Sequence, residues 1–203
     1  MIKPFDFGDG SGVFFTSDSH FGHKNIIPMT NRPFADAEEM DNALIKNWNN
    51  VVGKNDIVFH LGDFCFGNPS KWKEVLEQLN GNIYLILGNH DFKNLKANCY
   101  QYFIDIQQQM RIWIDDWILY LNHFPYLCCD GAWNLDRKVG QAFGHVHSCP
   151  DCKGLDMPRM QYLFPNQYDV GVDNNNYTPI SWKELKKIFE TNIAKSLENN
   201  GNN

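Results

Sequence analysis

Short apolar runs, each closed by glycine, aspartate, asparagine or histidine, recur along the chain. They are rich in β-branched and aromatic residues and span 13–15, 57–59, 83–87, 118–121 and 142–143. Runs of this length that end in loop-forming residues predict buried β-strands. The polar pair Asp115-Asp116 separates two further apolar stretches and predicts a hairpin turn. The pattern therefore indicates a molecule built around several short strands.

Apolar residues return at helical spacing in the segments between these strands. One such stretch covers 38–52. A second carries Trp72 to Leu79, with Ser70 as its expected N-cap and Asn80-Gly81 as its end. Strands that alternate with helices predict a layered α/β fold.

The end of the chain adds one more helix and a polar tail. Ser181 to Glu184 form a capping box that opens a helix to about residue 197, and we expect the Asn-rich tail 198–203 to be frayed. With 203 residues, of which 43% are hydrophobic and 14% aromatic, the chain can bury one substantial core. We therefore expect a single domain over residues 1–203.

Three features of the sequence indicate the cellular compartment of the protein: its N-terminus, its longest apolar runs and its cysteines. Residues 1–6 lack the apolar centre of a signal peptide, and no run approaches the ~20 apolar residues that span a bilayer. Without a secretory signal, the six cysteines are expected to be free thiols. The sequence thus predicts a soluble, cytoplasmic protein without a membrane partner, and it leaves the oligomeric state open.

The formal net charge of −6 offers no basic stripe for the nucleic-acid backbone. We therefore expect no strong non-specific binding to nucleic acids. A small phosphate ester or a nucleotide is still compatible with this charge, because bound divalent cations make a site locally positive.

Candidate chemistry lies at the ends of the predicted strands, in five short segments that hold five of the seven histidines. These segments are Asp18-Ser19-His20, Gly62-Asp63, Gly88-Asn89-His90-Asp91, His123 and Gly144-His145-Val146-His147. Imidazoles with carboxylates suit manganese, iron, zinc or nickel. The ligands are too many for one tetrahedral ion, but they suit two ions roughly 3.5–4 Å apart that share a bridging carboxylate. Such a pair produces a hydroxide near neutral pH and neutralises phosphoryl charge, and the glycines let the backbone turn close to the ions.

In this order the five segments resemble the calcineurin-like metallophosphoesterase superfamily. Its pattern, Asp-x-His, Gly-Asp, Gly-Asn-His-Asp/Glu, His and Gly-His-x-His, is present without substitution and spans most of the chain. The resemblance implies an α/β (α+β) fold of two facing mixed β-sheets flanked by helices, with the site at one edge. It also implies a hydrolase with two divalent metal ions, whose identity among manganese, iron, zinc and nickel is open.

The resemblance assigns a role to each residue of the five segments. One metal would be held by Asp18, His20, Asp63 and His147. Asp63 would bridge to the second metal, which would be completed by Asn89, His123 and His145. His90 matches the family's catalytic histidine, which is not a ligand: it would protonate the leaving-group oxygen or stabilise the phosphoryl charge, and Asp91 would orient it.

Departures from the protein phosphatases of the superfamily bear on the substrate. Those enzymes carry an Asp-Arg pair soon after Gly-Asp and an arginine before Gly-Asn-His, where this chain has Phe64-Cys65-Phe66 and Leu87. Such arginines grip the phosphate of a monoester. The doubled His-x-His, the opening segment 17–26 and Arg32-Pro33-Phe34 instead resemble small bacterial and phage-type phosphohydrolases. We expect phosphodiester hydrolysis. A nucleotide or small-molecule phosphomonoesterase, or a non-catalytic binding module, is an alternative.

Four further polar residues admit two interpretations. Strand alternation points His60 away from the motif, which favours a hydrogen-bonded strand histidine over a ligand. His23 and Asn25 lie on the loop after His20, and either could contact substrate. Arg32 would clamp a phosphate or form a surface ion pair.

The remaining polar features also have a structural interpretation. Cys149 and Cys152, with Cys128-Cys129, could form a zinc site, but adjacent cysteines are unusual ligands, and free thiols in a loop beside the site are the default. Asp173-Asn174 follows a predicted strand over 169–172, and turn chemistry accounts for the pair.

Overall fold

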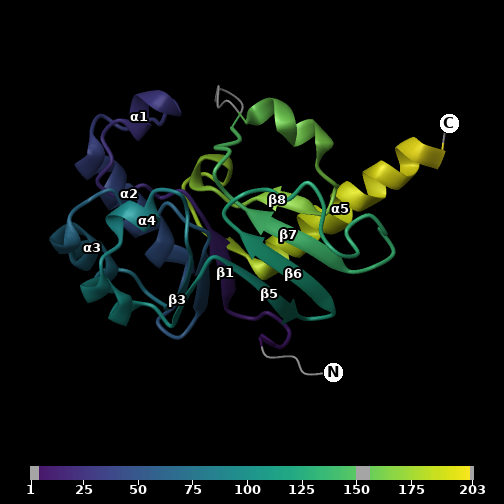
Figure 1. The fold of residues 1–203 in the computed structure, drawn as a ribbon, viewed down its shortest axis with the longest axis horizontal. Coiled ribbons are helices and arrows are strands. Elements are labelled where there is room, and N and C mark those ends of the chain that lie inside the picture. The colour runs from purple at the N-terminus through teal and green to yellow at the C-terminus, as the bar shows by residue number, and fades with distance from the viewer. Residues whose placement is uncertain (1–4, 150–155, 202–203) are drawn as a thin grey trace.

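The computed structural model describes residues 5–149 and 156–201, which form two mixed β-sheets that face each other (Figure 1). The first sheet has the order β4-β3-β2-β1-β9. Its strands are β1 (Val13–Thr16), β2 (Ile57–His60), β3 (Asn82–Ile86), β4 (Asp105–Gln107) and β9 (Ile180–Ser181). Neighbouring strands from β1 to β4 are parallel, and β9 is antiparallel to β1. The carboxyl ends of β1, β2 and β3 therefore meet at one edge.

The second sheet has the order β5-β6-β7-β8. Its strands are β5 (Gln109–Ile114), β6 (Trp117–Asn122), β7 (Val139–Phe143) and β8 (Gln167–Asp169). β5 and β6 form the predicted hairpin, with Asp115 in the left-handed region at φ 54°. β6, β7 and β8 are parallel to one another. The prediction of two facing mixed sheets flanked by helices is confirmed.

Alternation along the strands builds a shared core between the sheets. Phe15 of β1 and Phe59 of β2 are fully buried, with ring centroids 5.5 Å apart, and they belong to the same apolar cluster as Ile112 and Leu119 of the second sheet. Val58, which directly precedes Phe59 in β2, points the opposite way and belongs to a second apolar cluster beneath the helices. This period of two gives both faces of the first sheet an apolar layer.

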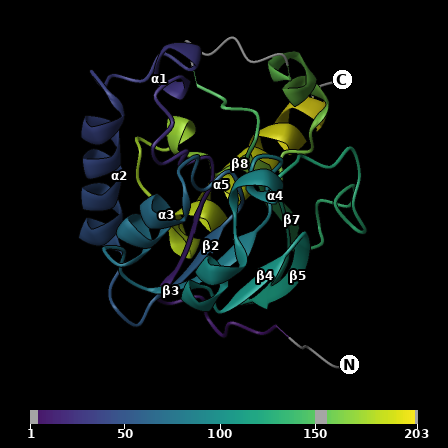
Figure 2. The same cartoon turned by 60° about the vertical axis from the view of Figure 1, so that its left-hand side comes forward.

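Helices cover the first sheet on the side away from the second sheet. They are the short α1 (Ile26–Met29), α2 (Ala37–Val51), α3 (Pro69–Leu76), α4 (Asp91–Asn94) and the 3-10 helix η1 (Ala97–Tyr102). Figure 2 shows α2 and α3 on one side of the molecule and β4 and β5 on the other. Two 3-10 helices, η2 (Met157–Tyr162) and η3 (Val172–Asn174), precede α5 (Trp182–Gly201). Among the described residues, no helix combines the length and the apolarity needed to cross a membrane.

Three helix boundaries differ from prediction, and one of them is the end of α3, which lies at Leu76 and not at Asn80-Gly81. The N-cap of α3 is Asn68, whose side chain accepts the N–H of Lys71 at 3.0 Å, and Pro69 opens the helix. Ser70 was the wrong choice because proline is well suited to the first helical position. α5 continues to Gly201, so the tail expected to be frayed is helical up to that residue, and the last two residues lie outside the described part.

Candidate metal centre

The five predicted segments converge at the edge where the parallel strands end. Asp18 follows β1, Asp63 follows β2 and Asn89 follows β3, while His123 follows β6 and His145 follows β7. Backbone hydrogen bonds tie the segments together: the N–H of Asp18 donates to Gly62 O at 2.9 Å, and the N–H of Gly144 donates to His123 O at 2.9 Å. The two sheets thus bring together residues separated by more than a hundred positions in the chain.

Backbone strain concentrates in these segments. Nine non-glycine residues with positive φ occur in the described chain, and five of them are candidate ligands: Asp18 (56°), His20 (52°), Asp63 (53°), His145 (71°) and His147 (51°). Such conformations cost of order 1–3 kcal/mol each and persist only where the surroundings enforce them. In both Asp-x-His and His-x-His, the strain falls on the two outer residues, which carry the candidate ligand atoms.

Gly62 illustrates why the glycines are needed. Its φ is +99°, and an added Cβ would lie 2.5 Å from Gly88 N and 2.7 Å from His123 Nδ1. No side chain fits between these loops. The predicted close approach of backbone at this glycine is confirmed.

The first half of the site consists of Asp18, His20 and His147, whose ligand atoms all lie within 4.8 Å of one another. Nε2 of His20 is 3.9 Å from Asp18 Oδ1 and 3.6 Å from Asp63 Oδ2, and Nε2 of His147 is 3.8 Å from Asp18 Oδ1. His147 donates through Nδ1 to Asp173 Oδ2 at 2.7 Å, which leaves its Nε2 lone pair facing the centre.

The second half is built around His123, which is grouped with Asp18 and Asp63 in a second cluster of potential ligands. His123 Nδ1 contacts the carbonyl of Leu61 at 2.8 Å, so in the neutral ring Nδ1 carries the proton and Nε2 is an acceptor. That Nε2 lies 3.0 Å from Asn89 Oδ1 and 3.6 Å from Asp63 Oδ2. Three acceptor atoms converge there, as ligands of one cation would.

Unsatisfied buried atoms at the centre also fit a cation. Asp18 Oδ1 and His20 Nε2 are buried and have no hydrogen-bond partner within the described part of the chain. Burial lowers the pKa of His20 well below its usual value, with help from the neighbouring His147 and Arg32, and so favours the neutral ring that binds metals. Burial, opposed by His123 and reinforced by Asp18, raises the pKa of Asp63 to about 7. Divalent cations would satisfy these atoms and neutralise the paired carboxylates.

His145 and His90 lie at the rim of the site. The backbone N–H of His145 donates to Asp18 Oδ2 at 2.8 Å, while its ring Nε2 lies 3.4 Å from Asp156 Oδ2. The side chain of His90 is 44% exposed, with Nε2 3.8 Å from Asp63 Oδ2, and its backbone N–H donates to Asp63 Oδ1 at 2.9 Å. His90 is thus open to a ligand arriving from solvent, unlike the buried His20 and His123.

The carboxylate of Asp91 accepts hydrogen bonds from backbone N–H groups, whereas the resemblance implies that it orients His90. Its Oδ2 accepts the N–H groups of Asp63 at 2.8 Å and Gly88 at 2.9 Å, and its Oδ1 accepts the N–H of Phe64 at 3.0 Å. Both oxygens are therefore occupied by the loops after β2 and β3. The sequence places Asp91 beside His90, but that adjacency does not determine which way the carboxylate points.

Arg32 forms a buried ion pair, not the surface ion pair that was one of its two interpretations. It is 4% exposed, and its guanidinium binds Asp173 through two hydrogen bonds of 2.8 Å. Although burial acts in the opposite direction, the hydrogen bond from His147 and the charge of Arg32 lower the pKa of Asp173 to about 2. Asp173 was expected to have only a role in a turn. Its carboxylate also forms a hydrogen bond with the candidate ligand His147.

The other histidines are bonded in different ways. His60 accepts the N–H of Gly62 on Nδ1 at 3.2 Å, and its Nε2 lies 2.9 Å from Ser19 Oγ, which confirms the hydrogen-bonded strand interpretation. His23 stacks on Phe66 with ring centroids 3.8 Å apart, and its Nδ1 is 3.3 Å from His20 Nδ1. Asn25 is exposed at the N-cap position of α1. Substrate contact by His23 or Asn25 stays a prediction.

Phe66 and Asp169 also lie beside the site. The ring of Phe66 lies 4.5 Å from the His90 ring and 5.3 Å from the His20 ring. Asp169 is buried and accepts Ser148 N–H at 2.9 Å and Gly171 N–H at 2.8 Å, which holds the segment after His147. The strand predicted over 169–172 is wrong in position, because β8 ends at Asp169, and only the assembled second sheet reveals what the carboxylate of Asp169 binds.

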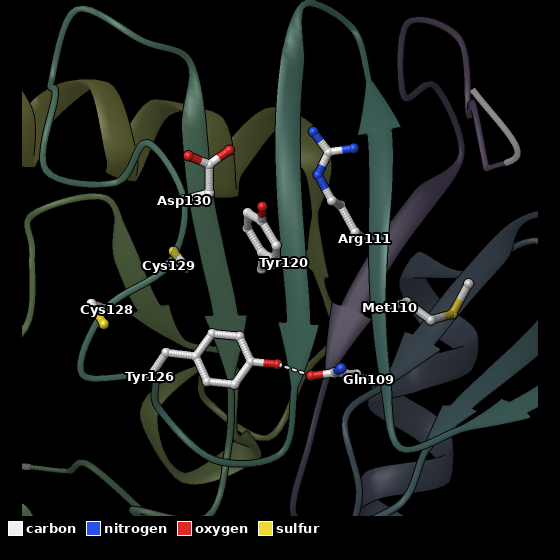
Figure 3. A pocket seen from close by; sticks show the side chains of 8 residues that line it. All are labelled: Gln109, Met110, Arg111, Tyr120, Tyr126, Cys128, Cys129 and Asp130. Atoms are coloured by element: carbon white, nitrogen blue, oxygen red, sulfur yellow. Dashed lines mark hydrogen bonds between the residues drawn. The ribbon is translucent and has the colours of Figure 1, made fainter. Parts of the chain in front are cut away.

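The described cysteines lie in several different environments. Cys128 and Cys129 are free thiols that line a pocket of about 490 Å³ beside Arg111 and Tyr120, on the outer face of β5 and β6 (Figure 3). Cys149 is disulfide-bonded, so the expectation of a free thiol is wrong at this position. Cys152 lies outside the described residues. Within residues 5–149 and 156–201, the groups of side chains that could hold a metal contain no cysteine.

Known proteins share both the sequence and the fold. The profile of the calcineurin-like phosphoesterases matches residues 12–166. An uncharacterized protein of Methanocaldococcus jannaschii is 42% identical over 189 residues, which cover 88% of this chain and 91% of that protein. The Gene 66 protein of Mycobacterium phage L5 is 31% identical over 80% of this chain and 87% of its own length. A solved protein of unknown function from Aquifex aeolicus superposes with a TM-score of 0.65 at 26% identity, covering 87% of this chain and 98% of that one.

Proposed function

This chain belongs to the calcineurin-like phosphoesterase family, and we propose that it is a dinuclear metal-dependent phosphoesterase that hydrolyses phosphodiesters. The observation that carries the proposal is the convergence of Asp18, His20, Asp63, His123 and His147 around buried atoms that lack partners. Nitrogen and carboxylate ligands in this number suit two borderline divalent ions, such as manganese, iron, zinc or nickel.

In this proposal the ligands divide into two sets that share one carboxylate. Asp18, His20 and His147 hold the first ion, Asp63 bridges, and a second set completes the site with Asn89, His123 and His145. The two ions, when bound, would lower the pKa of a water nucleophile and neutralise charge on the phosphoryl oxygens. The protein contributes ligand orientation: Leu61 O fixes His123 and Asp173 fixes His147.

We propose that His90 acts on the leaving group. Its side chain is 44% exposed, whereas the candidate ligands His20, Asp63 and His123 are buried, and its backbone N–H donates to Asp63 Oδ1. Burial lowers the pKa of His90, and the nearby His123 and His145 add to this, so the neutral ring is favoured. A neutral imidazole still has one N–H that can donate to the leaving oxygen.

Preference for a diester over a monoester rests on the surroundings of the site. A monoester dianion usually needs an additional cationic group, and Arg32 is the residue in the sequence that could provide it. All five N–H groups of Arg32 have partners within the protein. Beside His90, the stacked pair Phe66 and His23 offers a flat surface with apolar character, suited to an ester substituent.

The test compares bis(p-nitrophenyl) phosphate with p-nitrophenyl phosphate on the parent protein, with manganese, nickel or calcium added to metal-free protein. We expect a higher kcat/KM for the diester, with manganese or nickel more effective than calcium. A higher kcat/KM for the monoester would overturn the diester assignment and favour the phosphomonoesterase alternative. Metal binding without turnover of either ester would favour a binding module.

A further inference from the structure

Arg32 and Asp173 form a buried ion pair behind the metal centre, which we call the Arg32–Asp173 clamp. Nε and Nη2 of Arg32 donate to the two oxygens of Asp173 at 2.8 Å each, and the two side chains are 0% and 1% exposed. Paired charge-assisted hydrogen bonds of this kind fix the relative orientation of both groups. The two residues lie 141 positions apart in the chain.

The clamp reaches two segments of the proposed metal site. From the arginine side, Nη2 donates to the carbonyl of Asp18 at 2.8 Å and Nη1 donates to the carbonyl of Ser19 at 3.1 Å. From the aspartate side, Oδ2 accepts Nδ1–H of His147 at 2.7 Å. The clamp therefore joins the segment that carries Asp18 and His20 to the segment that carries His147.

These contacts fall where the backbone is strained. Asp18 and His20 have positive φ, and Arg32 binds the two carbonyls that lie between their α-carbons. His147 also has positive φ, and its ring is held by Asp173. A buried ion pair is by itself weak evidence for stability, because desolvation offsets the attraction. Orientation of ligands is the contribution that its partners indicate.

We infer that the Arg32–Asp173 clamp positions the Asp18, His20 and His147 half of the metal site and leaves the His123 half unaffected. The inference rests on the proposed dinuclear function. Loss of a hydrogen-bond partner behind a metal ligand typically lowers metal affinity ~10–100-fold. Because the clamp bonds the backbone of the Asp18 segment and the ring of His147, and none of its hydrogen bonds within the described chain reaches Asn89, His123 or His145, this loss should appear mainly in one of two binding events.

The experiment is calorimetric titration of metal-free protein with manganese. The variants are Asp173→Asn, which removes the charge, and Arg32→Lys, which keeps the charge but loses the paired geometry. The matched control is Asp41→Asn: Asp41 is 3% exposed, pairs with Lys71 at 2.9 Å and accepts Gly22 N–H, but contacts no candidate ligand. Circular dichroism and the Tm of the metal-free protein are measured in parallel.

We expect two binding events in the parent and in the control. In Asp173→Asn, one event should weaken ~10–100-fold while the other keeps the parent's Kd, and Arg32→Lys should show a smaller change in the same event. Equal affinities in parent and variants, or both events weakened together with a lower Tm, would overturn the inference. A parent that binds fewer than two manganese ions would instead overturn the proposed function.

Discussion

His90 differs from the buried histidines His20 and His123 because its side chain is 44% exposed and its ring forms no hydrogen bond among the described residues. If it assists departure of the leaving group without binding metal, His90→Ala should keep the metal content of the parent. Catalysis should slow by ~10²–10⁴-fold, the usual contribution of a general acid or base. Elemental analysis and kcat on the same preparation check both parts.

The effect of His90→Ala should depend on the leaving group. Esters with good leaving groups need little protonation, so the variant should lose less activity with p-nitrophenyl esters than with alkyl esters. Loss of metal in this variant would make His90 a ligand or a structural support, and the assigned role would fail.

The buried histidine His60 should make the stability of the folded protein depend on pH. Burial lowers its pKa from 6.5 to about 3. Above pH 6.5 neither state binds this proton, so the folded state is at its full stability. As the pH falls from 6.5 toward 3, the unfolded chain takes up a proton that the folded protein excludes, and stability declines by up to about 1.4 kcal/mol per pH unit.

His60→Gln removes this titration while keeping a side chain that can hydrogen-bond. Urea unfolding of the metal-free proteins from neutral pH to about pH 4.5 should show a shallower loss of stability in the variant than in the parent. Identical pH slopes would mean that His60 is not excluded from protonation in the folded state.

At the residue level, the sequence predicts ligand types far better than their supporting contacts. Asp18, Asp63 and His123 could be predicted because local runs place them at strand ends. Arg32 and Asp173 could not, because their partnership crosses 141 positions and depends on both sheets. Asp91 shows the same limit, since its three N–H donors come from two different loops.

Among the elements, α5 tests a local prediction directly. Ser181 Oγ accepts Glu184 N–H at 3.3 Å, and Glu184 Oε2 accepts Ser181 N–H at 3.0 Å, which is the predicted capping box. Ser181→Ala should lower the free energy of unfolding by about 1 kcal/mol. The control is Thr191→Ala in the helix interior, where the hydroxyl bonds the Lys187 carbonyl at 2.7 Å and should not stabilise the helix.

Urea unfolding of both variants at neutral pH measures the difference. A loss in Thr191→Ala as large as that in Ser181→Ala would show that the cap has no special role. Equal stability of Ser181→Ala and the parent would also contradict a stabilising role for the capping box.

Elements with a long periodic pattern were predicted well, and the shortest were not. The helix over 38–52 corresponds to α2, and the five apolar runs correspond to β1, β2, β3, β6 and β7. β4 and β9 have three and two residues, which is too short to show alternation. They exist because β3 and β1 offer free edges, a condition that only the assembled sheet creates.

For the whole molecule, strand order decides whether the proposed ligands meet. Parallel pairing of β1 with β2 and of β2 with β3 sends three chain segments to one edge, and β6 and β7 deliver two more from the opposite sheet. Neither strand order nor register follows from apolar runs alone. The resemblance to metallophosphoesterases supplied the two-sheet architecture, and the matching family profile and fold bear it out.

The central claim is that two metal ions bridged by Asp63 carry out phosphoester hydrolysis at this edge. The most direct measurement titrates metal-free protein with manganese and records bound metal and diesterase activity together, for the parent and for Asp63→Asn. We predict that activity of the parent rises to its maximum at two ions per chain, and that Asp63→Asn loses both bound metal and activity by orders of magnitude. Full activity without metal, or an Asp63→Asn protein with two ions and near-normal turnover, would contradict the account.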